Sequence, residues 1–192
     1  MEAEMGTGKV PNALKTDHRN ASARRVVTGV DSEGRSTIVS DGDVPTRFVG
    51  EAYTVNQVWQ AGTLPTPALA ENTLREGAGF VSPAAGYTYV ITTFPPDSSW
   101  DYERQYTKSL MDWGAGDALQ PGDAPGMHTT DSVDIVTVIS GEIWAVLETG
   151  ETLLKPGDTL IQRGTKHAWK NRSDADCTIS AVHVTAIRPS IA

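Results

Sequence analysis

Three side chains of the kind that bind cations are spaced along one stretch of the chain, residues 126–171. His128 and Asp134 lie at its start, and His167 follows the turn Arg163-Gly164-Thr165 near its end. Each falls at a turn-bounded strand position, and imidazole and carboxylate groups together suit zinc, iron, nickel or manganese. We therefore predict that His128, Asp134 and His167 are metal ligands. The alternative is that these histidines serve the structure alone.

Short strands separated by turns would have to hold these side chains. Residues 132–140 are rich in Val and Ile and alternate between two faces, which is typical of a strand. The run Pro156-Gly157-Asp158 predicts a tight turn, because proline presets φ and glycine accepts a positive φ. Further strands are predicted after residue 140, at 143–148, 151–155, 159–162, 167–171 and 178–186. Short strands at this regular spacing favour an antiparallel sandwich or barrel.

The spacing of these residues resembles the two sequence motifs of the cupin superfamily. In the first motif, His128 takes the place of the first histidine, Asp134 that of the glutamate and Gly141 that of the closing glycine. The second motif is matched at Gly150, Pro156, Gly157, Asp158, Gly164, His167 and Asn171. The resemblance implies an all-β fold, a single cupin (jelly-roll) β-barrel with an N-terminal β-hairpin extension.

The first motif departs from the family pattern at two positions. Thr130 stands where the family usually has its second histidine, and Asp134 replaces a longer glutamate. Two histidines and one carboxylate still suffice for a metal with open coordination positions. The implied cofactor is a divalent metal, Fe, Zn, Ni or Mn, and a metal-free site is the alternative. Thr130 would then hold a water through its hydroxyl or simply face the cavity.

Alternation along the barrel strands predicts a substrate pocket around the ligands. Trp169 shares a face with His167, and Val136 and Val138 share a face with Asp134. Together with Thr130 these residues form the predicted pocket, which suits a small organic substrate with one or two oxygen functions. His183 lies on the predicted last strand and is the first candidate for an acid/base group. The alternative for His183 is a hydrogen-bonded strand histidine without a catalytic role.

The predicted function is that of a small-molecule enzyme with His128, His167 and His183 as catalytic residues. We expect a metal-dependent lyase or isomerase that dehydrates, decarboxylates or enolises a small oxygenated metabolite, because such chemistry needs a Lewis acid and proton transfer. The same chemistry is possible in a metal-free site that uses the acid/base groups of the protein itself. One alternative is an Fe(II)-dependent dioxygenase or oxidoreductase. The other is a non-catalytic cupin that binds a small ligand.

The remaining segments are expected to frame this core. Residues 1–23 read as a flexible N-terminal arm and residues 24–192 as a single cupin domain. Runs at 24–30 and 35–40, joined by Asp31-Ser32-Glu33-Gly34, predict a β-hairpin, and the resemblance implies that it pairs across a homodimer. Strands are also predicted at 53–60 and 87–94, with a short helical turn at 68–75. Residues 61–86 and 98–125 read as long connections, the second carrying aromatic residues that would pack over the barrel mouth.

Composition excludes several classes of partner. The net charge of −8 and the pI of about 4.9 argue against binding of nucleic acid or an anionic membrane surface, which need basic patches. No apolar run reaches membrane-spanning length, and the first twenty residues contain no apolar stretch of a signal peptide. We therefore expect a cytoplasmic protein. The single cysteine excludes an intrachain disulfide.

Overall fold

The structure, a computed structural model, describes residues 17–74, 79–80 and 82–188. In this part of the chain the strands form a hairpin sheet, β1-β2, a small sheet in the order β10-β7-β8, and a large sheet in the order β3-β4-β5-β11-β6-β9. The strand bounds are β1 Arg24–Val30, β2 Ser36–Asp43, β3 Arg47–Val49, β4 Thr54–Ala61, β5 Tyr87–Phe94, β6 Ser132–Ser140, β7 Ile143–Leu147, β8 Glu151–Leu154, β9 Thr159–Arg163, β10 His167–Lys170 and β11 Cys177–Thr185.

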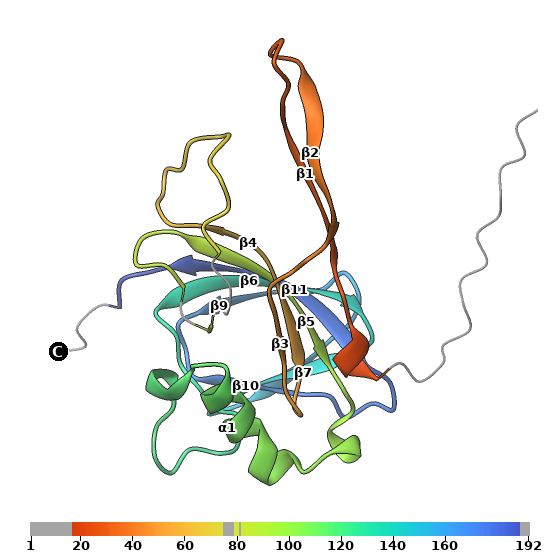
Figure 1. Ribbon diagram of the computed structural model, residues 1–192. Coiled ribbons are helices and arrows are strands. Elements are labelled where there is room, and N and C mark those ends of the chain that lie inside the picture. Colours follow the sequence, from red (N-terminus) through yellow and green to blue (C-terminus); the bar gives the residue numbers. More distant parts are fainter. Residues whose placement is uncertain (1–16, 75–78, 81, 189–192) are drawn as a thin grey trace, which may run out of the picture.

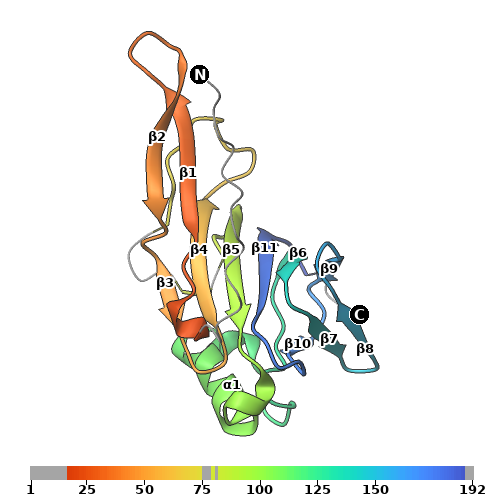
Figure 2. The same cartoon turned by 90° about the vertical axis from the view of Figure 1, so that its right-hand side faces the viewer.

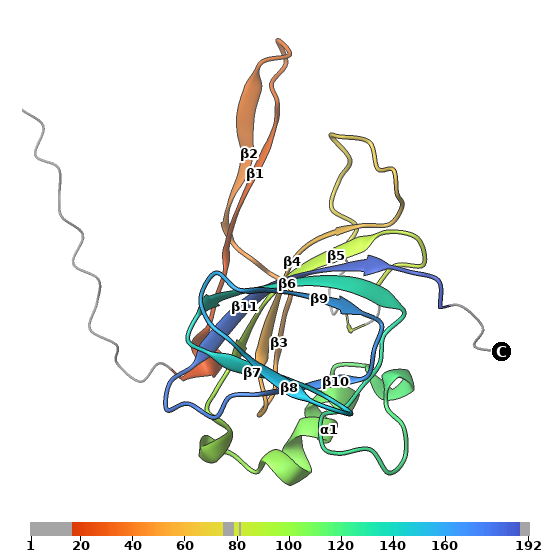
Figure 3. The same ribbon diagram turned by 180° about the vertical axis from the view of Figure 1, so that it is seen from behind.

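The large and small sheets face each other and enclose the hydrophobic core (Figure 3). Buried side chains from both layers meet between them, including Val55, Val90 and Ile179 from the large sheet and Ile143 and Ala145 from the small one. Alternation along β6 explains this arrangement, because Val136 and Val138 are buried while Ile135 and Ile139 are exposed. The predicted all-β cupin fold is confirmed.

The turns between the strands lie where the sequence predicts them. The strands β5 and β6 have the predicted bounds, and the others between residues 143 and 186 differ by one residue at one end or at both. Gly141, Gly157 and Gly164 all have positive φ, at 72°, 92° and 61°. A non-glycine residue is disfavoured in this conformation, so glycine marks these three turns.

The hairpin β1-β2 projects away from the two facing sheets (Figure 1). All eight residues of β2 are exposed, and β1 alternates between exposed and half-buried residues. Of the predicted arm at 1–23, residues 1–16 lie outside the described residues. The part that is described packs on the body, since His18 is buried and its Nε2 lies 3.0 Å from the Gly50 carbonyl oxygen.

A helix that the sequence analysis did not predict lies within the connection at 98–125. This helix, α1 (Tyr102–Asp112), begins at Asp101, whose side chain accepts a hydrogen bond from the Arg104 amide. Tyr106 and Leu110, four residues apart, bury one face of α1 against the core. The helix covers one end of the sheets (Figure 2), so the predicted packing of this segment on the barrel is confirmed. Within the described residues 68–74 there is no helix, and the expected helical turn is reduced to one hydrogen-bonded turn, in which the Ala70 amide donates to the Pro67 carbonyl oxygen at 3.0 Å.

Asn171, the last residue of the second motif, ties three segments together rather than entering the cavity. Its side-chain amide donates to the carbonyl oxygens of Phe94 and Ala175 at 3.0 and 2.8 Å, and its side-chain oxygen accepts from the Ser173 amide and hydroxyl. The residue is 1% exposed. Its place in the motif is therefore explained by structure, because each polar group of this buried side chain has a hydrogen-bond partner.

Replacing Asn171 with alanine is expected to lower the free energy of unfolding by about 1–3 kcal/mol, because the change removes the side-chain donor to the buried Phe94 carbonyl oxygen. Urea denaturation of both proteins measures the difference. Asn20→Ala, at an exposed position, is the control and should change stability by less than about 0.5 kcal/mol. Equal stability of Asn171→Ala and the parent protein would contradict this role.

No described helix is long and apolar enough to span a membrane.

Candidate functional site

Four ionisable side chains meet between the two facing sheets. His128 and His167 belong to the layer of the small sheet, where their backbones form a bridge with N–H to oxygen distances of 2.9 and 3.0 Å. Asp134 on β6 and His183 on β11 are directly opposite each other in the large sheet. The fold therefore brings two side chains from each layer to one place, although they are spread over 55 residues of sequence.

His128 and His167 present the same ring nitrogen to the interior. Nδ1 of His128 lies 2.8 Å from the Gly126 carbonyl oxygen, and Nδ1 of His167 lies 3.0 Å from the Thr165 carbonyl oxygen. A carbonyl oxygen can only accept, so each Nδ1 carries the hydrogen and each Nε2 keeps its lone pair. The ring centroids are 4.3 Å apart. Two neighbouring imidazoles that line one cavity therefore each keep a ring nitrogen that can accept a hydrogen bond.

Asp134 and His183 form a close pair within the large sheet. Asp134 Oδ1 lies 2.9 Å from His183 Nδ1, and the two side chains are 3% and 25% exposed. The contact has the distance of an ion pair, and Oδ1 makes no hydrogen bond of good geometry with the described residues. This leaves Nε2 of His183 available for exchange of a proton with a ligand.

Burial sets the charge of these groups. Burial, followed by the neighbouring His167, lowers the pKa of His128 to about 3. Burial also lowers the pKa of His167, although a hydrogen bond to Thr165 and the charge of Asp134 oppose this shift. Burial raises the pKa of Asp134, but His183 and the Ser132 hydroxyl outweigh it and the net shift is downward. At neutral pH the site therefore contains a carboxylate and two uncharged imidazoles.

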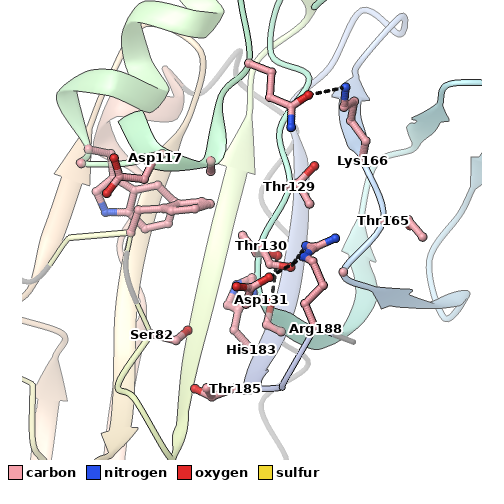
Figure 4. A pocket seen from close by; sticks show the side chains of 18 of the residues that line it. Ser82, Asp117, Thr129, Thr130, Asp131, Thr165, Lys166, His183, Thr185 and Arg188 are labelled. Atoms are coloured by element: carbon pink, nitrogen blue, oxygen red, sulfur yellow. Dashed lines mark hydrogen bonds and ion pairs between the residues drawn. The ribbon is translucent and has the colours of Figure 1, made fainter. Parts of the chain in front are cut away.

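Two cavities meet at these residues. An inner cavity of about 60 Å³, which we call the inner chamber, is lined by His128, Asp134, His167 and His183 and by apolar side chains of the core. An open cavity of about 880 Å³, the outer cleft, lies outside it. In Figure 4, Thr130, Asp131, His183 and Arg188 gather on one side of the outer cleft, with Asp117 on the other. Four residues line both cavities, namely Phe80, Trp113, Thr130 and His183.

The predicted pocket residues have different positions relative to these cavities. Thr130, Val136 and Trp169 line the inner chamber. Val138 is buried in the hydrophobic core and is not among the residues that line the chamber. Lys166 lines the outer cleft and forms ion pairs with Asp123 and Glu148 at 2.9 and 3.5 Å.

Aromatic residues complete the chamber, and the sequence analysis did not assign most of them to it. Phe80, Trp113, Tyr53 and Tyr106 line it in addition to Trp169. The Tyr106 hydroxyl accepts a hydrogen bond from the Trp169 amide at 3.3 Å, so α1 holds β10 in place. The available signal was the spacing of Tyr106, Leu110 and Trp113, which repeats every three to four residues as the buried face of a helix does.

The side chains of the chamber include groups of the kind that bind divalent metals. Two Nε2 lone pairs and a buried carboxylate oxygen without a well-aligned hydrogen bond are ligands that a divalent cation would use. Yet Asp134 already faces His183, and the described residues contain no group of three or more His, Cys, Asp or Glu side chains arranged to hold a metal ion. The side chains as arranged do not fit a metal, and coordination by His128, Asp134 and His167 stays a prediction.

The two buried imidazoles predict a pH-dependent stability. Between about pH 6.5, the ordinary pKa of histidine, and pH 3, the folded state binds fewer protons than the unfolded chain, because its histidine pKa values are lower. Stability should therefore fall as the pH drops through this window, by at most about 1.4 kcal/mol per pH unit for each histidine. The lowered pKa of Asp134 adds a loss only below about pH 4.

Urea denaturation in EDTA at pH 7, 6 and 5 measures how the free energy of unfolding changes with pH, without interference from metal. The variant His128→Gln should show a shallower slope over the same range, because glutamine does not titrate. A slope that is the same in parent and variant would contradict the assignment to His128.

Comparisons with known proteins agree with the geometry. Residues 117–184 match the sequence model of the family described as Cupin domain. This segment contains the three histidines and the aspartate that line the chamber, His128, His167, His183 and Asp134.

Three curated relatives illustrate where similar chains occur. The chain is 50% identical over 56 residues to phomopsin biosynthesis cluster protein C′ of Diaporthe leptostromiformis, covering 29% of this chain and 30% of the relative. It is 37% identical over 97 residues to oryzines biosynthesis cluster protein J of Aspergillus oryzae, covering 44% and 54%. It is 28% identical over 153 residues to the cupin-domain-containing oxidoreductase srdB of Neurospora crassa, covering 78% and 66%. Each match spans less than two thirds of the relative's length.

Proposed function

Because this chain is a cupin-domain protein, we propose that it is a small-molecule enzyme whose reaction takes place at the inner chamber. We further propose a lyase or isomerase that moves a proton on a small oxygenated metabolite. The observation that supports this most is the Asp134–His183 pair at 2.9 Å, which faces two buried imidazoles across the chamber. An acid and a base on opposite sides of a substrate are what proton transfer requires.

The proposed roles follow from the hydrogen bonds of each ring. His167 is uncharged and has a free Nε2, so it accepts a proton from a substrate carbon. The electrons of the broken C–H bond form a double bond, the C–O bond breaks, and protonated His183 gives its Nε2 proton to the departing oxygen, which leaves as water. Asp134 positions His183 through Nδ1, and His128 accepts a hydrogen bond from a substrate hydroxyl. In an isomerisation the proton returns to another carbon.

A divalent metal would polarise a substrate oxygen if one were bound. The arrangement of the described residues does not fit such a metal, and the proposed proton transfers need only the side chains of the chain itself. Elemental analysis of the purified protein, beside His128→Ala and His167→Ala, tests the prediction directly. Near-stoichiometric metal that disappears in both variants would support the predicted ligands.

An oxidoreductase is the second candidate, and a specific observation favours it. The relative srdB, named an oxidoreductase, aligns with 78% of this chain. The two candidates differ in whether the substrate is oxidised. Proton transfer leaves the overall oxidation level of the substrate unchanged, whereas an oxidoreductase changes it.

Turnover in D₂O separates the two candidates. A panel of β-hydroxy ketones is incubated with the protein while dissolved oxygen is recorded and product masses are measured by mass spectrometry. A lyase or isomerase incorporates deuterium or eliminates water without oxygen uptake. Products that have lost two hydrogens or gained oxygen would replace this proposal with the oxidoreductase. Saturable binding without any conversion of the bound compounds would favour a ligand-binding cupin.

For the quaternary structure we propose a homodimer joined through the hairpin β1-β2. Four apolar side chains of the hairpin are 44 to 61% exposed, namely Val26, Val30, Val39 and Ile38. A two-stranded hairpin has little stability without a covering layer, and a second copy of the chain would supply one. Sedimentation equilibrium tests the proposal: the parent protein should sediment at twice the mass of a variant that carries Ile38→Lys and Val39→Lys. A monomeric parent protein would refute it.

A further inference from the structure

The inner chamber and the outer cleft differ greatly in size. The outer cleft, at about 880 Å³, lies in the range of cavities that enclose drug-sized ligands. The inner chamber has about 60 Å³, whereas a cavity of about 150 Å³ is known to hold benzene. An aromatic ring is therefore too large for the inner chamber, and a group of three or four carbon atoms matches it better.

The two cavities also differ in polarity. Apart from its ionisable residues and two threonines, the inner chamber is lined by apolar and aromatic side chains, such as Val136, Ile179 and Ala181. The outer cleft is lined by hydroxyl groups, among them Ser82, Thr129 and Thr185, and by charged side chains. A ligand that fills both cavities must have an apolar end and a polar body.

The charges of the outer cleft largely neutralise one another. Arg188 Nε lies 2.7 Å from Asp131 Oδ1, and Lys166 pairs with Glu148 and with Asp123. Neither cation is available alone to an anionic ligand, and the further lining carboxylate of Asp117 would repel one. An uncharged polar body is therefore favoured over a carboxylate or phosphate.

Two of the four residues at the boundary between the cavities are aromatic. Phe80 and Trp113 are in edge-to-face contact with ring centroids 5.0 Å apart, and Phe80 also contacts the ring of His128 at 5.7 Å. Thr130 and His183 line the other side. A ligand that reaches from one cavity to the other passes His183, the residue proposed to exchange the proton.

We propose that the substrate is a molecule with an uncharged polar body, which stays in the outer cleft, and a short aliphatic group of three or four carbons, which enters the inner chamber. The reacting carbon then lies where the aliphatic group joins the polar body, between His167 in the inner chamber and His183 at the boundary. The location of the reacting carbon rests on the proposed function, whereas the placement of the two ends rests on the cavities alone.

Alkyl β-D-glucosides with methyl to hexyl chains test the placement, because they combine a hydroxyl-rich body with an aliphatic group of known length. Binding is followed by the fluorescence of Trp113 and Trp169, which line the chamber. Each carbon from methyl to propyl should tighten binding about fourfold, since a buried methylene contributes about 0.8 kcal/mol. The gain should stop at propyl or butyl, when the chamber is full. A propyl glucuronide, which carries a carboxylate, should bind more weakly than propyl glucoside.

Matched Ala→Leu variants locate the aliphatic group. Ala181 is 3% exposed and lines the inner chamber, so Ala181→Leu should fill it and remove the dependence on chain length while methyl glucoside binds within about twofold of the parent. Ala84 is exposed and lines the outer cleft, so Ala84→Leu should keep that dependence. Val136→Ala enlarges the chamber, so the gain in affinity with chain length should continue for one more carbon than in the parent protein. It also keeps the test decisive if Ala181→Leu does not fold.

The proposal is overturned by affinity that rises steadily to hexyl, by an unchanged chain-length dependence in both chamber variants, or by absence of binding throughout the series. None of these measurements involves turnover. A failure of the proposed proton transfer therefore shows in the D₂O assay alone, and a failure of the proposed substrate class shows in binding alone.

Discussion

The variant His167→Ala is expected to lose turnover by about 10²–10⁴-fold, the contribution that a positioned acid/base group makes. Alanine removes the free Nε2 that faces the inner chamber, and no neighbouring side chain supplies an equivalent lone pair in the same place. The fold should survive, because the backbone bridge to His128 does not depend on the side chain. Steady-state kinetics on a substrate identified in the D₂O assay measures the loss of turnover, and far-UV circular dichroism checks that the fold is kept.

A second buried histidine provides the matched control. His18 is 4% exposed, as is His167, but its Nε2 contacts the Gly50 carbonyl oxygen and it does not line the chamber. His18→Ala should therefore reduce stability and leave kcat within about twofold. Full turnover in His167→Ala would show that the chamber is not the place of reaction. Equal loss of kcat in both variants would show that general destabilisation, rather than chemistry, is responsible.

Gly126→Ala is expected to lower the free energy of unfolding by about 3 kcal/mol or more. Gly126 has φ of 75°, which costs an alanine about 1 kcal/mol. An added Cβ would also lie 2.3 Å from the Tyr106 ring, and Tyr106 is packed into the core with 2% exposure. Overpacking of this kind typically costs about 1–3 kcal/mol. The Gly126 carbonyl orients His128, so the variant should lose activity as well.

Gly122→Ala separates the two contributions. Gly122 has a similar positive φ of 90°, but an added Cβ would meet nothing within 4 Å. This variant should lose only about 1 kcal/mol. Urea denaturation of both variants gives the comparison. If Gly122→Ala and Gly126→Ala lose equal stability, the close approach of Tyr106 does not explain the glycine at position 126.

Local pattern determined much of the architecture. Alternation in residues 132–140 and the Gly and Pro turns around residues 141 and 157 placed the strands within one or two residues, because side-chain period and turn conformation are properties of short segments. Motif spacing likewise indicated that His128, Asp134 and His167 belong to one site. All three line the inner chamber.

Helix α1 was not predicted, because the composition of its segment outweighed the helical spacing of its apolar residues. The segment 98–125 contains scattered Gly, Pro and aromatic residues, which favoured a long connection. The tyrosine and leucine at 106 and 110 form a helical face only because the open end of the sheets is there to bury them. Tertiary packing supplies most of the stability of such a short helix.

Local sequence pattern placed most strands and turns along the chain, motif spacing singled out His128, Asp134 and His167, and His183 was named from its predicted strand. Only the tertiary structure decided that His183 faces Asp134, because β6 and β11 become neighbours through pairing between residues about 50 positions apart. The division into a small apolar chamber and a large polar cleft was also decided there. Phe80, Trp113, Thr130 and His183 come from four separate segments, and no local pattern records that they meet.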